Sequence, residues 1–504
     1  MAASYFPSDG VWGSLKTSPA TIALLSVLAV IGLLSARSKR TDSSKIYDLG
    51  GFPMLSAWFF FSQRYDFMCS TFKRTGQKMF RFRVLQHHVV ALSGDEGRKV
   101  FFTEKNFNMA EGYRILGGPV PRPQDINIRT VEESSRLFVR HVLGLFRKDR
   151  LMDVMPHLLE DINRRMDNWG KSGKVDPFKE MHNLVFQMTV RMGTCRELAD
   201  NPQATARLSE LFLLHEESAS PISLLLPWLP GRAKQTKEKA TQGLFDIVSH
   251  YVDLRRKATA QSSDAIDRLI ADGYDDATTI TYTLGIVFVG VGNTGTTICW
   301  ILIFLGDKPK WKAKVANEVR ALLRGQSNSS DPVHRRFASV PLHAWEEEMP
   351  VLDAVLKETM RLTMSGTVLR RNIGCDTFIG HKKIHDSDFV AYSLGDIHLD
   401  SDVYPDPLSF DPARFLEERE ETNKVSFPFV GWGAGRHPCA GMRAAKLEIK
   451  LAIALFFSKF EYDIVDVSGK LPKSLPQPDK NNIQSAKPLP GDTCYLKYER
   501  MDNF

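Results

Sequence analysis

The sequence has few cysteines, and none of them form a closely spaced pair. The 504 residues contain six cysteines and no CxxC motif. A disulfide framework or a structural zinc site normally brings cysteines closer together in sequence. The spacing argues against both and predicts reduced cysteines in a cytosol-facing domain. That interpretation fits Cys69, Cys195, Cys299, Cys375 and Cys494.

A concentrated block of basic charge is also absent. The formal net charge of +7 comes from scattered lysines and arginines, so we expect no nucleic-acid partner. Internal repeats and low-complexity tracts are missing as well. Since 43% of the residues are hydrophobic and 25% are charged, the composition is that of a globular protein with a large core. The modest positive charge allows an acidic partner protein or an anionic membrane surface.

A long apolar run lies near the amino terminus. Residues 19–36, PATIALLSVLAVIGLLSA, are close to the minimum of roughly 17 residues that span a bilayer as a helix. Four basic residues follow the run and one precedes it, which places the larger part of the chain in the cytosol. A cleaved signal peptide, the alternative, would carry its positive charges before the run. We therefore expect a short lumenal segment (1–18), a transmembrane anchor (19–36), a hinge linker (37–53) and a folded domain (54–504).

Helical periodicity dominates the folded domain. Residues 79–93 contain β-branched and aromatic residues around a polar break and predict a short hairpin. After the hairpin, the period and the scarcity of interior proline predict mostly helices. Their expected ranges are about 131–169, 176–199, 203–217, 233–259, 264–272, 276–305, 345–363 and 441–460. The predicted fold class is mainly α with a small β component, as a single large helical domain after an N-terminal transmembrane helix.

A glycine-rich loop surrounds the remaining cysteine, Cys439. In FPFVGWGAGRHPCAGMRAAKLEIK, three glycines precede Cys439 and Gly441 follows it, just before a helical stretch. Glycine lets the backbone approach a flat ligand closely, and a cysteine at a helix amino terminus is favoured as thiolate. Backbone amides can then hydrogen-bond the sulfur of a metal-bound thiolate. A buried structural cysteine is the alternative.

This string resembles the haem-binding signature F-x-x-G-x-x-x-C-x-G of the cytochrome P-450 superfamily. Gly435, Cys439 and Gly441 are in register, and Trp432 stands where phenylalanine is usual. The resemblance implies a cytochrome P-450-type fold in which Cys439 ligates the iron of haem b (iron protoporphyrin IX). Gly435, Gly441 and Trp432 would then lie against the cofactor.

Two further strings resemble the same family, in the expected order. Glu358 and Arg361 in LDAVLKETMRL match its E-x-x-R helix, and FDPARF matches its P-x-R-F element with Arg414. Alone, a Glu–Arg pair three residues apart is common on helix surfaces. The resemblance implies that Glu358, Arg361 and Arg414 form a buried network that supports the cysteine loop.

The segment FVGVGNTGTTICWILIFL resembles the family's oxygen-activating helix. Its clustered glycines indicate either close helix packing or a widened groove for oxygen and water. The resemblance implies that Thr294 helps to deliver protons and puts Asn293 where most relatives have an acid. An amide orients water but cannot ionise, so a haem-thiolate isomerase or dehydratase is the alternative to a monooxygenase.

Cationic residues near these motifs are candidates for binding the haem propionates. The resemblance points to His437 and to Arg370, whose neighbour Arg371 competes, and to Arg136 or Arg140 for a further arginine. Expected substrate walls are the segments 111–118, 220–230 and 364–369 and the helix around Val289. Their apolar character indicates a lipophilic substrate.

The resemblance implies a haem-thiolate monooxygenase, an oxidoreductase that inserts one oxygen atom from O2 into a C–H bond of a lipophilic small molecule. Terpenoids, sterols and other secondary metabolites fit that description. The thiolate favours O–O cleavage, and electrons would come from an NADPH–cytochrome reductase steered by basic residues. The candidates for steering are Arg436, Arg443, Lys446 and Lys450. The anchor and the style of the motifs indicate a eukaryotic, fungal enzyme of the endoplasmic reticulum membrane, single-pass, with its catalytic domain facing the cytosol.

Overall fold

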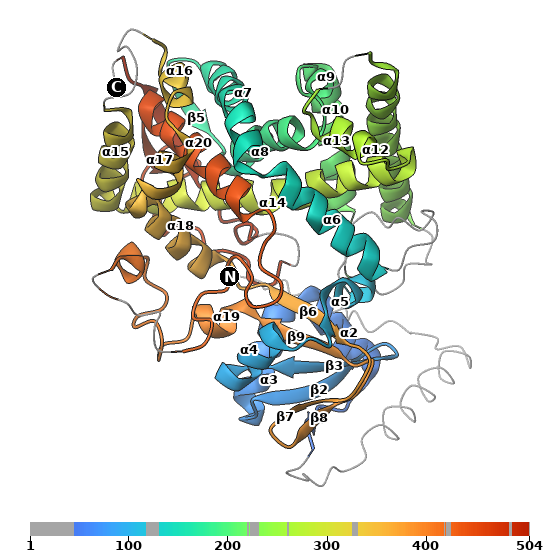
Figure 1. Ribbon diagram of the computed structural model, residues 1–504. Coiled ribbons are helices and arrows are strands. Elements are labelled where there is room, and N and C mark those ends of the chain that lie inside the picture. The colour runs from blue at the N-terminus through green and yellow to red at the C-terminus, as the bar shows by residue number, and fades with distance from the viewer. Residues whose placement is uncertain are drawn as a thin grey trace, which may run out of the picture.

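Helices make up most of the chain, and the largest sheet lies beneath them (Figure 1). The computed structural model describes residues 45–116, 131–218, 221, 231–259, 262–324, 331–417, 419, 425–482 and 486–502. The predicted segments 1–18 and 19–36 lie outside these residues, as does most of the wall segment 220–230. The predicted fold class, mainly α with a small β component, is confirmed.

The helices are numbered along the chain. They are α2 (Pro53–Ser62), α3 (Arg64–Thr75), α4 (Gly94–Thr103), α5 (Met109–Leu116), α6 (Val131–Leu145), α7 (Lys148–Asp167), α8 (Pro177–Gly193), α9 (Arg196–Ala199), α10 (Pro202–Glu217), α12 (Arg232–Lys257), α13 (Ala265–Ala271), α14 (Asp276–Asp307), α15 (Pro309–Leu323), α16 (Val333–Ala338), α17 (Leu342–Glu347), α18 (Pro350–Thr363), α19 (Leu394–His398) and α20 (Met442–Lys459). A single 3-10 turn spans Pro412–Phe415.

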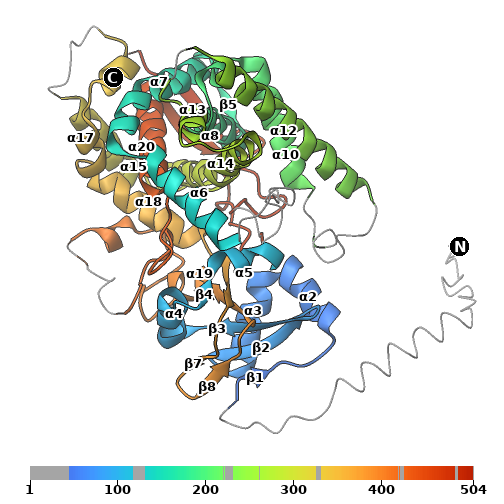
Figure 2. The ribbon, with the colours of Figure 1, turned by 45° about the vertical axis from the view of Figure 1, so that its right-hand side comes forward.

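A six-stranded sheet forms the lower part of the molecule, in the order β1-β2-β3-β9-β6-β4. The predicted hairpin is confirmed. Its strands β2 (Met79–Val84) and β3 (His87–Leu92) pair antiparallel, and β3 pairs in parallel with β9 (Phe389–Ser393). The remaining strands of this sheet are β1 (Tyr47–Asp48), β4 (Phe107–Asn108) and β6 (Thr367–Asn372). Segments some 300 residues apart in sequence thus build one sheet beside α2, α3 and α4 (Figure 2).

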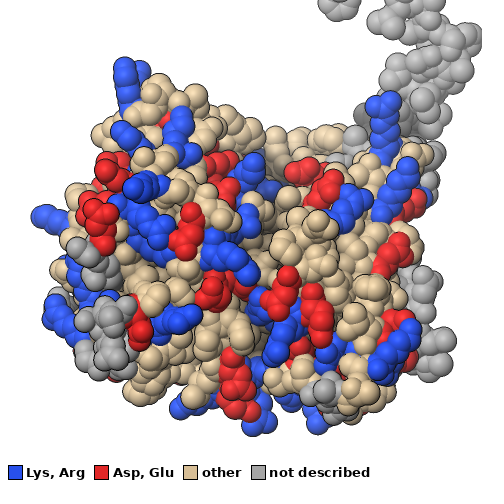
Figure 3. All heavy atoms as spheres, turned by 90° about the horizontal axis from the view of Figure 1, so that it is seen from above, with Lys and Arg blue, Asp and Glu red and all other residues tan. Residues whose placement is uncertain are grey.

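A second sheet ties the carboxy terminus to the helical part. It has the order β10-β11-β5, with β10 (Phe460–Val465), β11 (Tyr495–Arg500) and β5 (Ser172–Val175) all antiparallel. A short hairpin, β7 (Thr377–Ile379) with β8 (Lys382–Ile384), completes the strands. On the face seen from above, basic and acidic side chains are interspersed, so that face has no patch of one sign (Figure 3).

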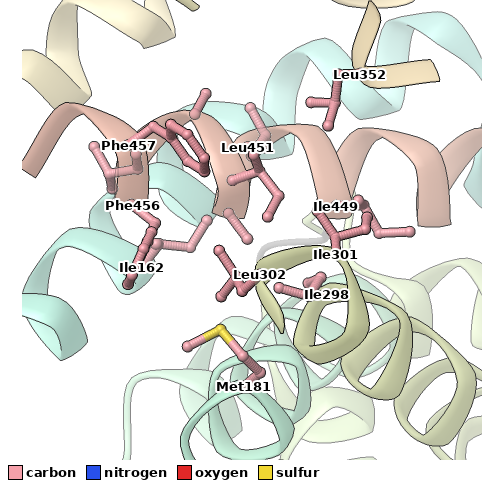
Figure 4. Close-up of a cluster of buried hydrophobic side chains, with 14 of the residues drawn as sticks. Ile162, Met181, Ile298, Ile301, Leu302, Leu352, Ile449, Leu451, Phe456 and Phe457 are labelled. Atoms are coloured by element: carbon pink, nitrogen blue, oxygen red, sulfur yellow. The ribbon is translucent and has the colours of Figure 1, made fainter. Parts of the chain in front are cut away.

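The main core lies where α14 crosses the helices around it. Side chains of α7, α8, α18 and α20 converge on α14 (Figure 4). Those labelled there are Ile162, Met181, Ile298, Ile301, Leu302, Leu352, Ile449, Leu451, Phe456 and Phe457. Helix α14 is long and apolar enough to cross a membrane. Most of its apolar stretch is buried inside the protein, which identifies it as a core helix.

Three predicted helices are broken in the structure. The stretch 176–199 divides into α8 and α9, because Thr194 and Cys195 are not helical. The stretch 131–169 divides into α6 and α7, because Arg147 has an extended backbone. The stretch 345–363 divides at Met349, which precedes Pro350 and is not helical. A residue before proline is sterically disfavoured in the helical region. The predictions for 276–305 and 441–460 are confirmed as α14 and α20.

Candidate functional site

The loop that carries Cys439 is a tight turn in the middle of the molecule, between the helices and the large sheet (Figure 1). The Cys439 amide donates to the Trp432 carbonyl at 2.7 Å, and the Arg436 amide donates to the Phe102 carbonyl at 3.0 Å. Gly435 has φ +58°, and a Cβ there would lie 2.1 Å from the Phe102 oxygen. Only glycine fits this close approach to α4. Trp432 is half-buried and packs against the main core.

The Cys439 sulfur is both accessible and surrounded by protein. The side chain is exposed, yet burial among neighbouring atoms raises the pKa of its thiol, while hydrogen bonds from the Gly441 and Met442 amides lower it. A side chain at the floor of a recess has this combination. Without a metal, burial opposes the charged form of Cys439, whereas the two amides favour the thiolate. A bound metal supplies the missing charge, since coordination deprotonates a thiol.

Glu358, Arg361 and Arg414 lie together beneath this loop. Arg361 donates Nε to Glu358 Oε2 at 2.7 Å and Nη2 to Oε1 at 2.8 Å, and neither residue is exposed to solvent. Arg414 Nε lies 3.4 Å from Glu358 Oε1. The Asp411 amide also donates to Glu358 at 2.9 Å. Removing one member of such a buried pair costs about 3–5 kcal/mol.

His398 links this network to the cysteine loop and was missed from the sequence. Its carbonyl accepts from Arg361 Nη1 at 2.7 Å. Its Nε2 accepts from the Val430 amide at 3.1 Å, so Nδ1 carries the proton and donates to the Met364 carbonyl at 2.9 Å. Burial lowers the pKa of His398 to about 4, which keeps it neutral. No local motif marks this histidine, because its partners are distant in sequence.

One face of α14 is open in the middle of an otherwise buried helix. Val289 is 55% exposed, and Asn293, one turn later, is exposed as well. A Cβ on Gly292, between them on this face, would have no atom closer than Glu216 Oε1 at 3.9 Å. Thr294 is 6% exposed. The structure therefore brings Asn293 to the open face, and the role expected of Thr294 stays a prediction.

The other two glycines of the predicted cluster, Gly290 and Gly295, serve helix packing. A Cβ on Gly290 would lie 2.7 Å from Thr189 Cγ2, and one on Gly295 would lie 3.4 Å from the His182 Cα, both on α8. The helix is α-helical from Asp276 to Asp307, without a widened turn. Of the two interpretations of the glycine cluster, close packing describes these two positions, and the open groove is confined to Gly292.

Arg370 is a buried cation that lacks a carboxylate partner within the described ranges. It is 3% exposed, its Nη1 donates to the Leu369 carbonyl at 2.7 Å, and its Nε has no hydrogen-bond partner. Burial lowers its pKa. It also lowers the pKa of the neighbouring His437, and Arg370 and Arg436 act in the same direction. A buried guanidinium without a counter-ion is costly unless an anion binds to it. The propionate carboxylates of a haem are anions that Arg370 and His437 could bind.

Other candidate cations are neutralised or lie on the surface. Arg371 pairs with Glu111 at 3.2 Å, which leaves Arg370 as the cation of that pair of arginines. Arg136 and Arg140 are both exposed, so the geometry selects neither. Three of the four basic residues predicted to steer a reductase are also paired, and the fourth, Arg436, is exposed. Arg443 lies 2.6 Å from Glu346, Lys446 lies 3.0 Å from Asp353, and Lys450 is buried against Asp353 at 3.0 Å.

Comparison with known proteins agrees with this geometry. The family model "Cytochrome P450" matches residues 49–486. Cytochrome P450 monooxygenase AacuE of Aspergillus aculeatus is 28% identical over 88% of this chain and 91% of its own length. Cytochrome P450 monooxygenase nsrP of Aspergillus novofumigatus is 27% identical over 97% of this chain and 96% of its own.

A solved structure shares the fold. Retinoic acid-bound cyanobacterial CYP120A1 superimposes with a TM-score of 0.73 at 21% identity, over 91% of this chain and 99% of that one. Three features fit haem b. They are the accessible Cys439 sulfur just before α20, the buried Arg370 that has no carboxylate partner among the described residues, and the open face of α14. The chain that arranges them is a member of the cytochrome P-450 family, an oxidoreductase that binds protoporphyrin IX haem through a cysteine thiolate.

Proposed function

We propose that this chain is a membrane-bound monooxygenase of fungal secondary metabolism that inserts one atom of O2 into a C–H bond of a lipophilic substrate. The observation that carries the proposal is the Cys439 sulfur, accessible at the floor of a recess and held by the amides of Gly441 and Met442. The fungal monooxygenases that match most of the chain support the reaction class. A terpenoid, sterol or similar metabolite fits the apolar walls.

Different residues have different roles in such a site. When bound, thiolate-ligated haem supplies oxygen activation. The Gly441 and Met442 amides hydrogen-bond the sulfur and limit its charge. Arg370 and His437 would hold the propionates, Arg370 as a buried cation and His437 as an imidazole N–H donor. The network of Glu358, Arg361 and Arg414 fixes the loop from below.

The open face of α14 forms the opposite side of the proposed site. Val289 and the start of β6 would contact the substrate and exclude water around it. The Asn293 amide, exposed on this face, can orient a water molecule but cannot take up or release a proton at neutral pH. Protons would therefore reach the site through ordered water, with Asn293 holding one of those molecules in position.

The exposed Asn293 on α14 also favours a second candidate function. An isomerase or dehydratase needs no external electrons and no proton relay, and a face with Asn293 in place of an acid suits that chemistry. The relatives that match most of the chain are monooxygenases, so the isomerase stands as the alternative. Turnover with and without NADPH and a reductase separates the two, because only the monooxygenase needs both.

The remaining partners follow from the same proposal. An NADPH–cytochrome reductase would deliver electrons from the side of the Cys439 loop, where the Arg436 side chain is exposed. The anchor 19–36 would hold the enzyme in the endoplasmic reticulum membrane as a single-pass protein with its domain in the cytosol. We expect no nucleic-acid partner.

The decisive test is the carbon monoxide difference spectrum of the reduced, haem-loaded protein. We expect the Soret position of a thiolate ligand in the wild type and its loss in Cys439→Ala. Cys375→Ala, which removes another exposed cysteine, is the matched control and should keep the band. A thiolate band that persists in Cys439→Ala would refute the ligand assignment.

A further inference from the structure

Arg64 is a buried cation that the proposed chemistry does not use. It begins α3 and is 7% exposed. Its Nε donates to the Phe60 carbonyl at 2.9 Å, and its guanidinium lies 4.2 Å from the centre of the Phe60 ring. Within the described ranges no carboxylate reaches it. Burial lowers its pKa to about 10, so it stays charged at neutral pH.

Such an arrangement is costly unless an anion completes it. Taking a charge out of water without a counter-ion costs several kcal/mol, and the penalty is offset only by a partner of opposite charge with good hydrogen-bond geometry. The Nε hydrogen bond and the Phe60 ring fix the plane of the guanidinium. A guanidinium with a fixed plane is pre-organised for a two-pronged hydrogen bond to a carboxylate.

Tyr113 connects Arg64 to the recess. This tyrosine is 39% exposed and lies on α5, which both views place next to α2 and β6 (Figures 1 and 2). Burial lowers the pKa of Arg64 and of Arg370, and the nearby Tyr113 acts against that effect at both, with a hydrogen bond at Arg370. Arginines from α3 and β6 therefore approach one phenol from α5.

A contact with the expected substrate wall lies one helical turn from Arg64. Met68 is one helical turn after Arg64, and both belong to the buried face of α3. The Thr367 hydroxyl contacts Met68 Sδ at 3.5 Å. Thr367 belongs to the wall segment 364–369, where a Cβ on Gly366 would meet no atom within 4 Å. Arg64 thus lies one helical turn before a residue that touches this wall, next to the exposed Gly366.

We propose that Arg64 and Tyr113 form a carboxylate-binding site at the edge of the recess, which anchors an acidic group of an otherwise lipophilic substrate. The haem propionates already have Arg370 and His437, so Arg64 is a surplus cation on the substrate side. The inference rests on the proposed function, because it names the substrate class of that same site. It predicts an acid with an apolar body, whose oxidised carbon lies away from the carboxylate.

Spectral titration of the haem-loaded full-length enzyme tests this site. The probes are dodecanoic acid, abietic acid and an anthracene carboxylic acid, each compared with its methyl ester at pH 7.5, where the acids are ionised. At least one acid should bind about tenfold more tightly than its ester, the effect of one charge-assisted hydrogen-bonded pair. Arg64→Gln should abolish that preference and leave ester binding unchanged, and Tyr113→Phe should reduce it. Arg74→Gln, on the exposed side of the same helix, should retain it.

The outcomes separate this inference from the function on which it rests. Three results overturn the carboxylate site: no acid preferred over its ester, an Arg64→Gln variant that weakens acid and ester equally, or an Arg64→Gln variant that loses haem. The third result would make Arg64 a cofactor ligand. A wild-type enzyme without the thiolate band would instead refute the proposed function, and that spectrum is recorded before any titration.

Discussion

Asn293 and Thr294 are neighbours in sequence but point in different directions from α14. The exposed residue is Asn293, on the same face as Val289, and Thr294 is buried. On a helix, consecutive side chains point about 100° apart, so the two residues differ in how far they face the open side of α14. The resemblance assigned the proton-delivering hydroxyl to Thr294, and the geometry favours a water-positioning role for Asn293.

The difference in exposure between Asn293 and Thr294 predicts that only one of two alanine substitutions will lower the product formed per NADPH. In Asn293→Ala, product formed per NADPH should fall by about tenfold, because losing one hydrogen bond to an ordered water costs about 1.4 kcal/mol of barrier. Thr294→Ala should leave that ratio unchanged and lower stability by about 1 kcal/mol. The measurement is product against NADPH consumption and peroxide release at saturating substrate. Uncoupling in Thr294→Ala alone would reverse the assignment.

The ligating cysteine and the Glu–Arg pair could be predicted because each belongs to a short local string. His398 and Arg64 could not. Both matter through partners that folding brings to them: Val430, 32 residues after His398, and Tyr113, on a different helix from Arg64. Sequence patterns report local geometry, whereas a buried charge without a counter-ion becomes visible only when its surroundings are known.

At the scale of elements, the loop before α20 depends on contact with α4. Gly435 and Gly441 both belong to the family signature but differ in their surroundings. Gly435 has φ +58°, and its added Cβ would collide with the Phe102 carbonyl. At Gly441, where φ is −91°, the nearest atom to an added Cβ is Phe146 Cε2 at 3.8 Å. The loop therefore needs glycine at the first position for its shape.

Alanine substitutions at these two positions test that distinction. Gly435→Ala should lower the free energy of unfolding by about 3 kcal/mol or more, since backbone strain costs 1–3 kcal/mol before the clash is counted. Gly441→Ala should cost less than about 1 kcal/mol, the effect of a poorer helix cap. Thermal unfolding followed at the Soret band reports both. Equal losses would show that the contact with Phe102 does not control the loop.

The elements that could be predicted are those whose pattern of apolar residues is complete within a single stretch of sequence. The helices α14 and α20 and the hairpin of β2 and β3 each have a continuous pattern. The break at Met349 depends on a proline that a helical period alone overlooks. The pairing of β3 with β9 joins segments some 300 residues apart, and no local pattern encodes that register.

At the scale of the whole molecule, α2, the first helix of the described residues, presents an apolar face. Four large apolar residues of α2 are exposed at positions that repeat every helical turn: Met54, Leu55, Trp58 and Phe59. An isolated exposed apolar side chain is ordinary, but a contiguous face marks an interaction surface. Tryptophan is enriched at the interface between membrane and water. Since α2 follows the hinge linker 37–53, we expect this face to rest on the bilayer.

That arrangement predicts that removing residues 2–40 will not release the protein from membranes. The truncated enzyme should still float with anionic phospholipid vesicles, because several partly inserted apolar side chains together contribute a few kcal/mol. Replacing Leu55, Trp58 and Phe59 by serine in the truncated protein should release it. Serine at Phe378, Val467 and Leu471, equally exposed but elsewhere on the surface, should not. If both triple variants lose binding alike, general surface hydrophobicity accounts for the association, and if the truncated enzyme stays in solution, the apolar run 19–36 alone holds it to the bilayer.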